Sequence, residues 1–364
     1  MPPTAPFPLP LLLLLSPLVV LAASPSPSPF PLVVNTWAGP FTVATDAAFL
    51  ALAGNSSSSS DPSSDPFSLS AATAIDAVHA GCTACEAARC DGTVGPGGSP
   101  DEACETTLDA LLIDGRTLNV GAVAGLRRVA AAATVARHVL ELTGHSLLVG
   151  DQATAYAVRH GLAEENLSSA ESRAACDAWR ARGCLPNFRA GVVPDPDDPE
   201  CAAAAPRAHD TLSLIAIDAR GNIAAGTTTN GAAHKIPGRA GDAAIPGSGA
   251  YADSDVGACG ATGDGDIMMR FLPCYQAVES MRRGMAPRDA ARDAVARMAA
   301  RYPGVRAGLV VVSRDGVHAG AACGWEFQYA WRGGGMERAE VVVVEALRLG
   351  EGEGGGEEGR VKDL

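Results

Sequence analysis

Positive charge is scarce in this sequence. Of the 364 residues, 28 are basic and 41 are acidic, which gives a formal net charge of −13. Lys235 and Lys362 are the only lysines, and every other basic residue is an arginine. A protein that binds nucleic acid needs a basic surface to neutralise phosphates, so this composition argues against that class. With 47% hydrophobic and 19% charged residues, the chain instead has the composition of a folded protein with a sizeable core.

Long apolar runs are also rare. The only one is LPLLLLLSPLVVLAA at 9–23. It is short for a membrane span and small residues follow it, which is typical of a signal peptide cleaved near Ala22 or Ala23. We therefore expect residues 1–23 to be a signal peptide, with an uncleaved membrane anchor as the alternative. The mature protein is expected to be soluble and to enter the secretory pathway.

The common catalytic signatures are missing as well. The sequence contains no G-x-S-x-G elbow, no Walker loop and no H-E-x-x-H motif. None of its seven histidines has a partner at metal-ligand spacing. These absences argue against serine hydrolases of the elbow type, P-loop enzymes and zinc peptidases, and we expect no metal and no cofactor.

Ten cysteines in a chain that enters the secretory pathway indicate disulfide bonds. Cys82, Cys85, Cys90 and Cys104 form a cluster whose C-x-x-C pair is also compatible with half a zinc site. No second C-x-x-C follows, so disulfides are the better interpretation. The sequons at Asn55 and Asn166 are candidate glycosylation sites.

Hydrophobic patterning predicts helices and strands that come in blocks. Helical spacing occurs at 70–80, 127–142, 267–283 and 287–301, and strands are predicted at 33–37, 107–113, 211–217, 223–229, 308–312, 317–322 and 339–344. Neighbouring strands are joined by hairpins, which favours an α+β fold with antiparallel sheets over a doubly wound parallel fold. Between these elements we expect a disordered Ser-rich loop at 55–64, an irregular proline-rich stretch at 177–206 and a polar glycine-rich stretch at 231–265, and we expect a disordered tail at 350–364.

Candidate chemistry concentrates between His209 and Asp266. The sequence His209-Asp210-Thr211 begins the first predicted hairpin, and the return strand ends in three threonines and Asn230. Strand propensity alone accounts for threonines at such positions. The hairpin nevertheless brings Thr229 close to Thr211, so that hydroxyl groups gather there.

Two glycine-rich loops follow this hairpin. In PGRAGD at 237–242, Arg239 and Asp242 are held by a loop, where arginine is suited to bind a carboxylate and aspartate an ammonium. Together they match the zwitterionic end of an α-amino acid; a weak surface salt bridge is the alternative. In ATGDGD at 261–266, backbone N–H groups before a helix are suited to bind an oxyanion, with a simple helix cap as the alternative.

Read together, these segments resemble the glycosylasparaginases (aspartylglucosaminidases), which are N-terminal-nucleophile amidohydrolases. The resemblance runs from Val33 to about Gly324. The blocks that carry it are VVNTW at 33–37, GCTACEAARCDGTVGPGGSPDE at 81–102, ETTLDALLIDG at 105–115, LNVGAVAGLRR at 118–128, LLVGDQAT at 147–154, HDT at 209–211, IAAGTTTNG at 223–231, GRAGD at 238–242, IPGSGAYAD at 245–253, ATGDGD at 261–266 and MRFLPCYQAVESMRRG at 269–284. The HDT, NTW and CDG blocks favour this branch over the related isoaspartyl-peptidase/asparaginase branch.

The resemblance implies that the precursor cleaves itself between Asp210 and Thr211. Thr211 would then be an N-terminal nucleophile whose own α-amino group, with a reference pKa of about 8, is its base. By the same resemblance Thr229 bonds the nucleophile, and Thr262 and Gly263 form the oxyanion hole.

The resemblance also assigns the substrate contacts. Arg239 and Asp242 are implied to bind the α-carboxylate and α-ammonium groups of the substrate, and Trp37 to line the pocket. Thr93 stands where relatives carry a serine that supports self-cleavage. Gly263 is implied to contact the substrate as well.

The implied fold is a four-layer αββα sandwich of the N-terminal-nucleophile type. Its subunits would be 24–210 and 211–364, paired as an (αβ)2 heterotetramer in a lysosome or vacuole, or outside the cell. The implied reaction is hydrolysis of the amide between N-acetylglucosamine and an asparagine whose α-amino and α-carboxyl groups are free, through a β-aspartyl ester on Thr211. The resemblance and the secretory signal favour the disulfides Cys85–Cys90 and Cys184–Cys201. The pairing of the other cysteines stays open: Cys82, Cys104, Cys176, Cys259, Cys274 and Cys323.

Three alternatives remain at this stage. The first is a β-aspartyl peptidase or L-asparaginase with the same nucleophile. The second is an uncleaved, inactive secreted homologue. The third is a binding protein stabilised by disulfides or metal.

Overall fold

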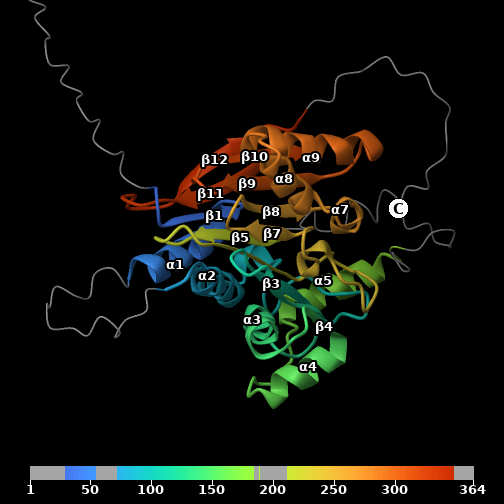
Figure 1. Cartoon of the computed structure of the whole chain (residues 1–364). Helices are drawn as coiled ribbons and strands as arrows, with labels where there is room; N and C mark the ends of the chain where they lie inside the picture. The colour runs from blue at the N-terminus through green and yellow to red at the C-terminus, as the bar shows by residue number, and fades with distance from the viewer. Residues whose placement is uncertain (1–28, 55–71, 184–187, 189–210, 348–364) are drawn as a thin grey trace, which may run out of the picture.

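The computed structural model describes residues 29–54, 72–183, 188 and 211–347. Two β-sheets and several α-helices pack together in it, so the predicted α+β class is confirmed (Figure 1). Several predictions lie outside the described residues: the signal peptide, Asn55, the Cys184–Cys201 pair, Asp210 and the tail. Within the described ranges, no helix has the length and apolar character needed to cross a membrane.

The larger sheet has eight strands in the order β12-β11-β1-β5-β6-β2-β3-β4. All neighbours are antiparallel except β3 and β4, which are parallel. The strands are β1 (Leu32–Thr36), β2 (Leu108–Asp114), β3 (Asn119–Leu126), β4 (Leu147–Val149), β5 (Leu212–Ile217), β6 (Ile223–Thr229), β11 (Phe327–Arg332) and β12 (Glu340–Val344).

The smaller sheet has four antiparallel strands in the order β10-β9-β8-β7. They are β7 (Ala250–Asp253), β8 (Gly257–Gly263), β9 (Ala307–Ser313) and β10 (His318–Cys323). The two predicted hairpins are confirmed as β5–β6 in the larger sheet and β9–β10 in the smaller one.

The two sheets are contacted by different helices (Figure 1). Helices α1, α2 and α3 contact the larger sheet, whereas α8 and α9 contact the smaller one. The described helices are α1 (Thr42–Ala53), α2 (Ala74–Ala88), α3 (Ala132–Leu142), α4 (Gly150–Arg159), α5 (Ala170–Ala181), α7 (Gly265–Phe271), α8 (Pro273–Arg282) and α9 (Pro287–Arg301), with short 3₁₀ turns η1 (Gly39–Phe41), η2 (Cys90–Gly92) and η3 (Asp242–Ala244).

The core explains why the central strands are apolar at nearly every position. Leu214 in β5 packs in the cluster beneath α1, α2 and α3, whereas its neighbour Ile215 packs between the two sheets. In β9, Leu309 faces α8 and α9, and Val310 faces the larger sheet. A strand buried on both faces has no polar side, so its sequence is a continuous hydrophobic run rather than an alternation.

Two sequence predictions are wrong. The helix predicted at 267–283 is two helices, because Leu272 adopts a left-handed backbone (φ 51°) and Pro273 lacks the backbone N–H that would continue α7. The stretch predicted to be irregular begins at 177, but 177–181 belong to α5, because the first proline of this stretch comes only at Pro186. The glycine-rich stretch at 231–265, where no strand was predicted, contains β7 and β8. In β8 a Cβ on Gly260 would lie 2.9 Å from the Cβ of Ser213, so small residues allow the sheets to approach closely.

Candidate active site

Thr211 lies at the start of β5, in the middle of the larger sheet, and is only 4% exposed. The Thr36 hydroxyl on β1 donates to the Thr211 carbonyl (2.8 Å) and accepts from the Ser213 N–H (2.9 Å). This pair of hydrogen bonds crosses the sheet and fixes the backbone on either side of Leu212. The candidate nucleophile is therefore held rigidly, as catalytic geometry requires.

Thr262, near the end of β8, meets Thr211 from the other sheet. Its hydroxyl oxygen accepts a hydrogen bond from the Thr211 backbone N–H (3.1 Å) and another from the Trp37 indole N–H (3.2 Å). Trp37 has a left-handed backbone (φ 73°), and its ring packs edge-on against Trp325 and Phe327. The strained backbone of Trp37 and its aromatic neighbours thus hold the indole against the Thr262 hydroxyl.

Thr229 ends β6, beside Thr211. Leu212 pairs with Thr228 in the hairpin, so the next residues outward, Thr211 and Thr229, are neighbours. The expectation that the hairpin brings these two threonines together is confirmed. The Gly231 N–H donates to the Thr229 hydroxyl oxygen (3.0 Å), which orients this side chain.

Arg239 and Asp242 come from the loop after β6. The Arg239 guanidinium donates to both carboxylate oxygens of Asp266 on α7 (3.3 and 2.9 Å). Asp242 is 4% exposed, and its Oδ2 has no hydrogen-bond partner among the described residues. Burial raises the pKa of Asp242 to about 7, although the neighbouring Arg239 charge lowers it. A buried carboxylate oxygen without a partner is suited to receive a cationic ligand group.

These side chains share one small pocket. Thr211, Thr229, Arg239, Asp242 and Gly263 line it, together with Gly231, Ala232 and Gly241, around a narrow accessible volume of about 10 Å³. The pocket combines the hydroxyl groups of two threonines with a cation and an anion. A larger hollow lies near the N-terminus of α2, but no predicted site residue lines it.

Two glycines make room for the arginine. A Cβ on Gly231 would lie 2.9 Å from Nη1 of Arg239, and a Cβ on Gly241 would lie 2.7 Å from the same atom. The Gly241 N–H donates to the Asp109 carboxylate on β2 (2.9 Å), and the other Asp109 oxygen accepts from the Gly125 N–H (2.7 Å). Asp109 therefore anchors the loop that carries Arg239.

Thr93 lies outside the pocket lining. Its hydroxyl donates to the Asp91 carboxylate (2.6 Å), and its carbonyl accepts from the N–H of Asn230, the residue that follows Thr229. A single hydrogen bond thus connects Thr93 to the residue that follows β6. Its expected partner in self-cleavage, Asp210, is not among the described residues.

The cysteine predictions are answered in part. The disulfide Cys85–Cys90 is confirmed, which leaves no C-x-x-C pair for zinc. Within the described ranges, no group of three or more histidine, cysteine or acidic side chains could hold a metal. The open pairings resolve into Cys104–Cys176 and Cys259–Cys274, while Cys82 and Cys323 form no disulfide.

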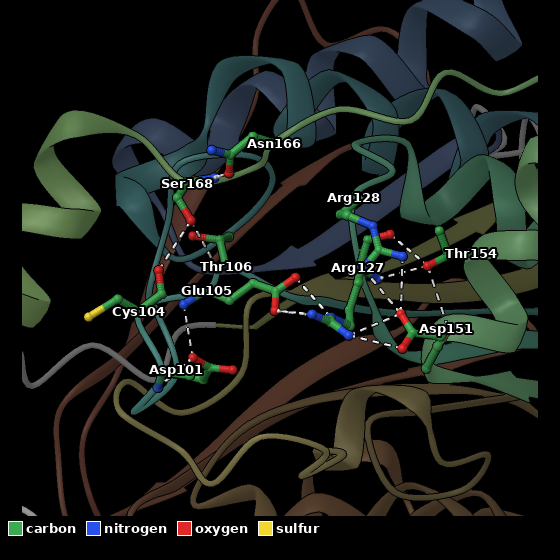
Figure 2. Close-up of polar contacts among 12 residues, drawn as sticks. Asp101, Cys104, Glu105, Thr106, Arg127, Arg128, Asp151, Thr154, Asn166 and Ser168 are labelled. Atoms are coloured by element: carbon green, nitrogen blue, oxygen red, sulfur yellow. Dashed lines mark hydrogen bonds and ion pairs between the residues drawn. The ribbon is translucent and has the colours of Figure 1, made fainter.

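The second candidate sequon is at the surface. Asn166 is exposed, and its side-chain oxygen accepts from the Ser168 N–H (3.0 Å). Figure 2 shows that the Ser168 hydroxyl in turn donates to the Cys104 carbonyl (3.2 Å), close to the Cys104–Cys176 disulfide. Beside it, Arg127 bridges Glu105 and Asp151. These contacts hold the 97–106 loop against the segment that leads into α5.

Sequence reasoning missed three charged residues of the site. Asp266 pairs with Arg239, Asp109 anchors the Arg239 loop, and the buried Lys235 donates to the Asn230 carbonyl. Asp266 was interpreted only as part of a helix cap. The rarity of lysine was a usable signal for Lys235, whereas Asp109 sits in an apolar strand with no motif around it.

Comparison with known proteins identifies relatives that align with most of this chain. The family described as Asparaginase matches residues 67–341. A protein of Arabidopsis thaliana named "Probable isoaspartyl peptidase/L-asparaginase 3" is 46% identical over 341 residues, which cover 86% of this chain and 90% of the relative. Proteins of Mus musculus and Rattus norvegicus named N(4)-(beta-N-acetylglucosaminyl)-L-asparaginase are also 46% identical, over 80% of this chain and 84% of each relative. The chain therefore belongs to the asparaginase family of N-terminal-nucleophile hydrolases.

Proposed function

We propose that this protein is an autoprocessed N4-(β-N-acetylglucosaminyl)-L-asparaginase. It hydrolyses the amide that joins N-acetylglucosamine to asparagine, and it acts on asparagine whose α-amino and α-carboxyl groups are both free. The observation that carries the proposal is the pocket that Thr211 and Thr229 line together with Arg239 and Asp242. The names of the mouse and rat relatives point to the same activity.

Maturation begins with self-cleavage. The Thr211 hydroxyl attacks the Asp210 carbonyl carbon, and the acyl group moves from the Thr211 nitrogen to its oxygen. This shift breaks the peptide bond and frees the α-amino group of Thr211. Water then hydrolyses the ester, which leaves a carboxylate on Asp210 and restores the Thr211 hydroxyl. Thr93 supports this step from the loop that is hydrogen-bonded to Asn230.

Hydrolysis uses the new N-terminus as the base. The α-amino group takes the proton of the Thr211 hydroxyl, whose oxygen attacks the side-chain amide carbon of the substrate. Thr229 donates to the nucleophile, and the Thr262 hydroxyl with the Gly263 N–H stabilises the oxyanion. The aminosugar leaves, and water hydrolyses the β-aspartyl ester to release aspartate. No histidine is needed, because the nucleophile carries its own base.

The two charged residues select the substrate. Arg239 binds the α-carboxylate through its fork of donors, and Asp242 binds the α-ammonium through its otherwise unpartnered Oδ2. Trp37 closes the pocket beside Thr262. An asparagine within an intact polypeptide has neither free group, so intact glycoproteins are poor substrates.

We propose the following organisation for the mature enzyme. A signal peptide at 1–23 directs it to the secretory pathway, and the lysosome or vacuole is its destination, with the extracellular space as the alternative. Subunits 24–210 and 211–364 build one αββα sandwich, and two such pairs form an (αβ)2 heterotetramer. The contacts of α1–α3 and of α8–α9 with opposite sheets support the sandwich layering.

A β-aspartyl peptidase or L-asparaginase activity is the second candidate. The name of the Arabidopsis relative favours it, and its substrates carry the same free α-groups. Turnover of N-acetylglucosaminyl-asparagine, β-aspartyl dipeptides and asparagine by one purified sample ranks the two activities. A clear preference for β-aspartyl dipeptides would replace the first candidate by the second.

N-terminal sequencing of the purified protein tests self-cleavage. We expect two chains, of which the smaller begins Thr-Leu-Ser-Leu, and we expect Thr211→Ala to stay a single inactive chain. N-acetylglucosaminyl-asparagine should be hydrolysed, whereas the same substrate with an acetylated α-amino group should be nearly inert. Cleavage of Thr211→Ala at the same bond would contradict the mechanism, and equal turnover of the two substrates would contradict the clamp.

A further inference from the structure

Lys235 is the most deeply buried cation of the described residues, with 1% of its surface exposed. Its ammonium group donates to the Asn230 carbonyl. Burial and the nearby Arg239 charge lower the pKa of Lys235, while the carboxylates of Asp109 and Asp101 favour its charged form. Burying a charged group is costly unless it is hydrogen-bonded and compensated, so its contacts at this position deserve a functional explanation.

Asn230 connects the end of β6 to the loop that contains Thr93. It is fully buried; its N–H donates to the Thr93 carbonyl (2.8 Å), and its side-chain amide donates to the Gly95 carbonyl (2.9 Å). These bonds fix the Asn230 backbone nitrogen and side chain. These bonds do not involve the Asn230 carbonyl or the Gly231 N–H. The peptide group between Asn230 and Gly231 is therefore held by other contacts.

Both polar atoms of that peptide group point at residues of the site. Its carbonyl accepts from Lys235, and its N–H, on Gly231, donates to the Thr229 hydroxyl oxygen (3.0 Å). A peptide group is planar, so fixing the carbonyl direction also fixes the N–H direction. A cation on the carbonyl also polarises the group and strengthens the N–H as a donor.

The geometry points to Lys235 as a positioning residue for hydrolysis. We infer that Lys235 holds the Asn230–Gly231 peptide plane, and that this plane holds the Thr229 hydroxyl in the orientation that serves Thr211. The inference rests on the proposed function, because it assigns the mechanism by which Thr229 is aimed. Lys235 touches no reacting atom in this scheme, and its action on the nucleophile passes entirely through Thr229.

Two substitutions at Lys235 separate this role from a general stabilising role. Lys235→Met removes the donor while keeping a similar apolar stem, and Lys235→Gln restores a neutral donor. We expect Lys235→Met to lower kcat by about 10- to 100-fold, as for loss of a charge-assisted hydrogen bond, and to change KM by less than about threefold. Lys235→Gln should recover most of the lost kcat. Rates are divided by the amount of cleaved small chain, so that incomplete processing does not count as slow chemistry.

Two control variants accompany them. Lys362→Met removes the only other lysine of the chain, and Met298→Ala opens a cavity in the core beneath α9, far along the chain from the site. Met298→Ala should lower the melting temperature with kcat unchanged, which shows what destabilisation alone does. If Lys235→Met has the melting temperature of the parent but does not cleave itself, self-cleavage is compared in place of kcat. Self-cleavage of Lys235→Gln then supports the same positioning role for Lys235.

The inference is overturned if Lys235→Met keeps the parental kcat, if it raises KM instead, or if Lys235→Gln is as impaired as Lys235→Met. The parent protein decides the proposed function separately. Failure of the parent to hydrolyse N-acetylglucosaminyl-asparagine refutes that activity, and the Lys235 comparison is then made with the substrate that the parent does hydrolyse.

Discussion

The role proposed for Asp242 predicts that substrate binding depends on pH in a way that can be measured. Burial raises its pKa to about 7, and its Oδ2 has no partner among the described residues. Only the ionised form pairs with an α-ammonium group. About 90% of Asp242 is ionised at pH 8, about 10% at pH 6 and about 1% at pH 5.

The affinity for a ligand falls with the fraction of protein that is competent to bind it. We therefore expect the inhibition constant of the product L-aspartate to rise from pH 8 to pH 5, by about 100-fold. The α-ammonium and both carboxylates of free aspartate keep their charges over this range, so the ligand itself contributes little to the change. The assay is competitive inhibition of hydrolysis at pH 5, 6, 7 and 8.

Two variants assign the effect to Asp242. Asp242→Asn should bind aspartate weakly at every pH and should lose the slope, because its amide does not titrate. Asp266→Asn is the matched control: it removes a carboxylate that also contacts Arg239 but is 51% exposed, so the slope should persist. A flat inhibition constant in the parent, or an unchanged slope in Asp242→Asn, would refute the reasoning.

Two further predictions concern stability, and both use urea unfolding of the uncut Thr211→Ala chain. Burial raises the pKa of Glu86 from 4.5 to about 7, so the folded state holds a proton that the unfolded chain releases, and stability falls as pH rises from about 4.5 to about 7. Glu86→Gln should reduce the stability lost between pH 4 and pH 8 by about 3 kcal/mol; parallel curves for variant and parent would contradict this. Replacing Cys104 and Cys176 by alanine opens a link between residues 72 apart and should cost about 4 kcal/mol, whereas Cys323→Ala, with no disulfide to lose, should cost far less. Equal losses in the two cysteine variants would show that the link does not constrain the unfolded chain.

Local patterns predicted the parts of the fold that local physics controls. The hairpins β5–β6 and β9–β10 follow from apolar runs separated by turn residues, and α9 follows from helical spacing after Pro287. The strands β7 and β8 were missed because they lack this contrast. The β8 sequence GACGATG has low strand propensity, and it forms a strand because it pairs with β7 and β9.

The residues of the candidate site likewise include some that sequence motifs identified and some that they did not. The threonines and the Arg239/Asp242 loop were identified from motifs, because each motif is contiguous in the chain. The partners of these motifs are not contiguous: Thr36 reaches Thr211 across 175 positions, and Asp109 reaches Gly241 across 132. No local signal marks such partners, since an isolated threonine in a strand has the same sequence appearance whether or not it supports a catalytic residue.

The sequence by itself determined which chemistry we propose for this protein, because the candidate nucleophile, its neighbouring threonine and the candidate charged clamp are all present as short motifs with the required side chains. Only the tertiary structure decided how those groups are held. It paired Cys104 with Cys176 and Cys259 with Cys274, and it turned the buried Lys235 toward the peptide group beside Thr229. The physical reason is that hydrogen bonds and disulfides depend on distances in space, and packing of the two sheets, rather than spacing along the chain, sets those distances.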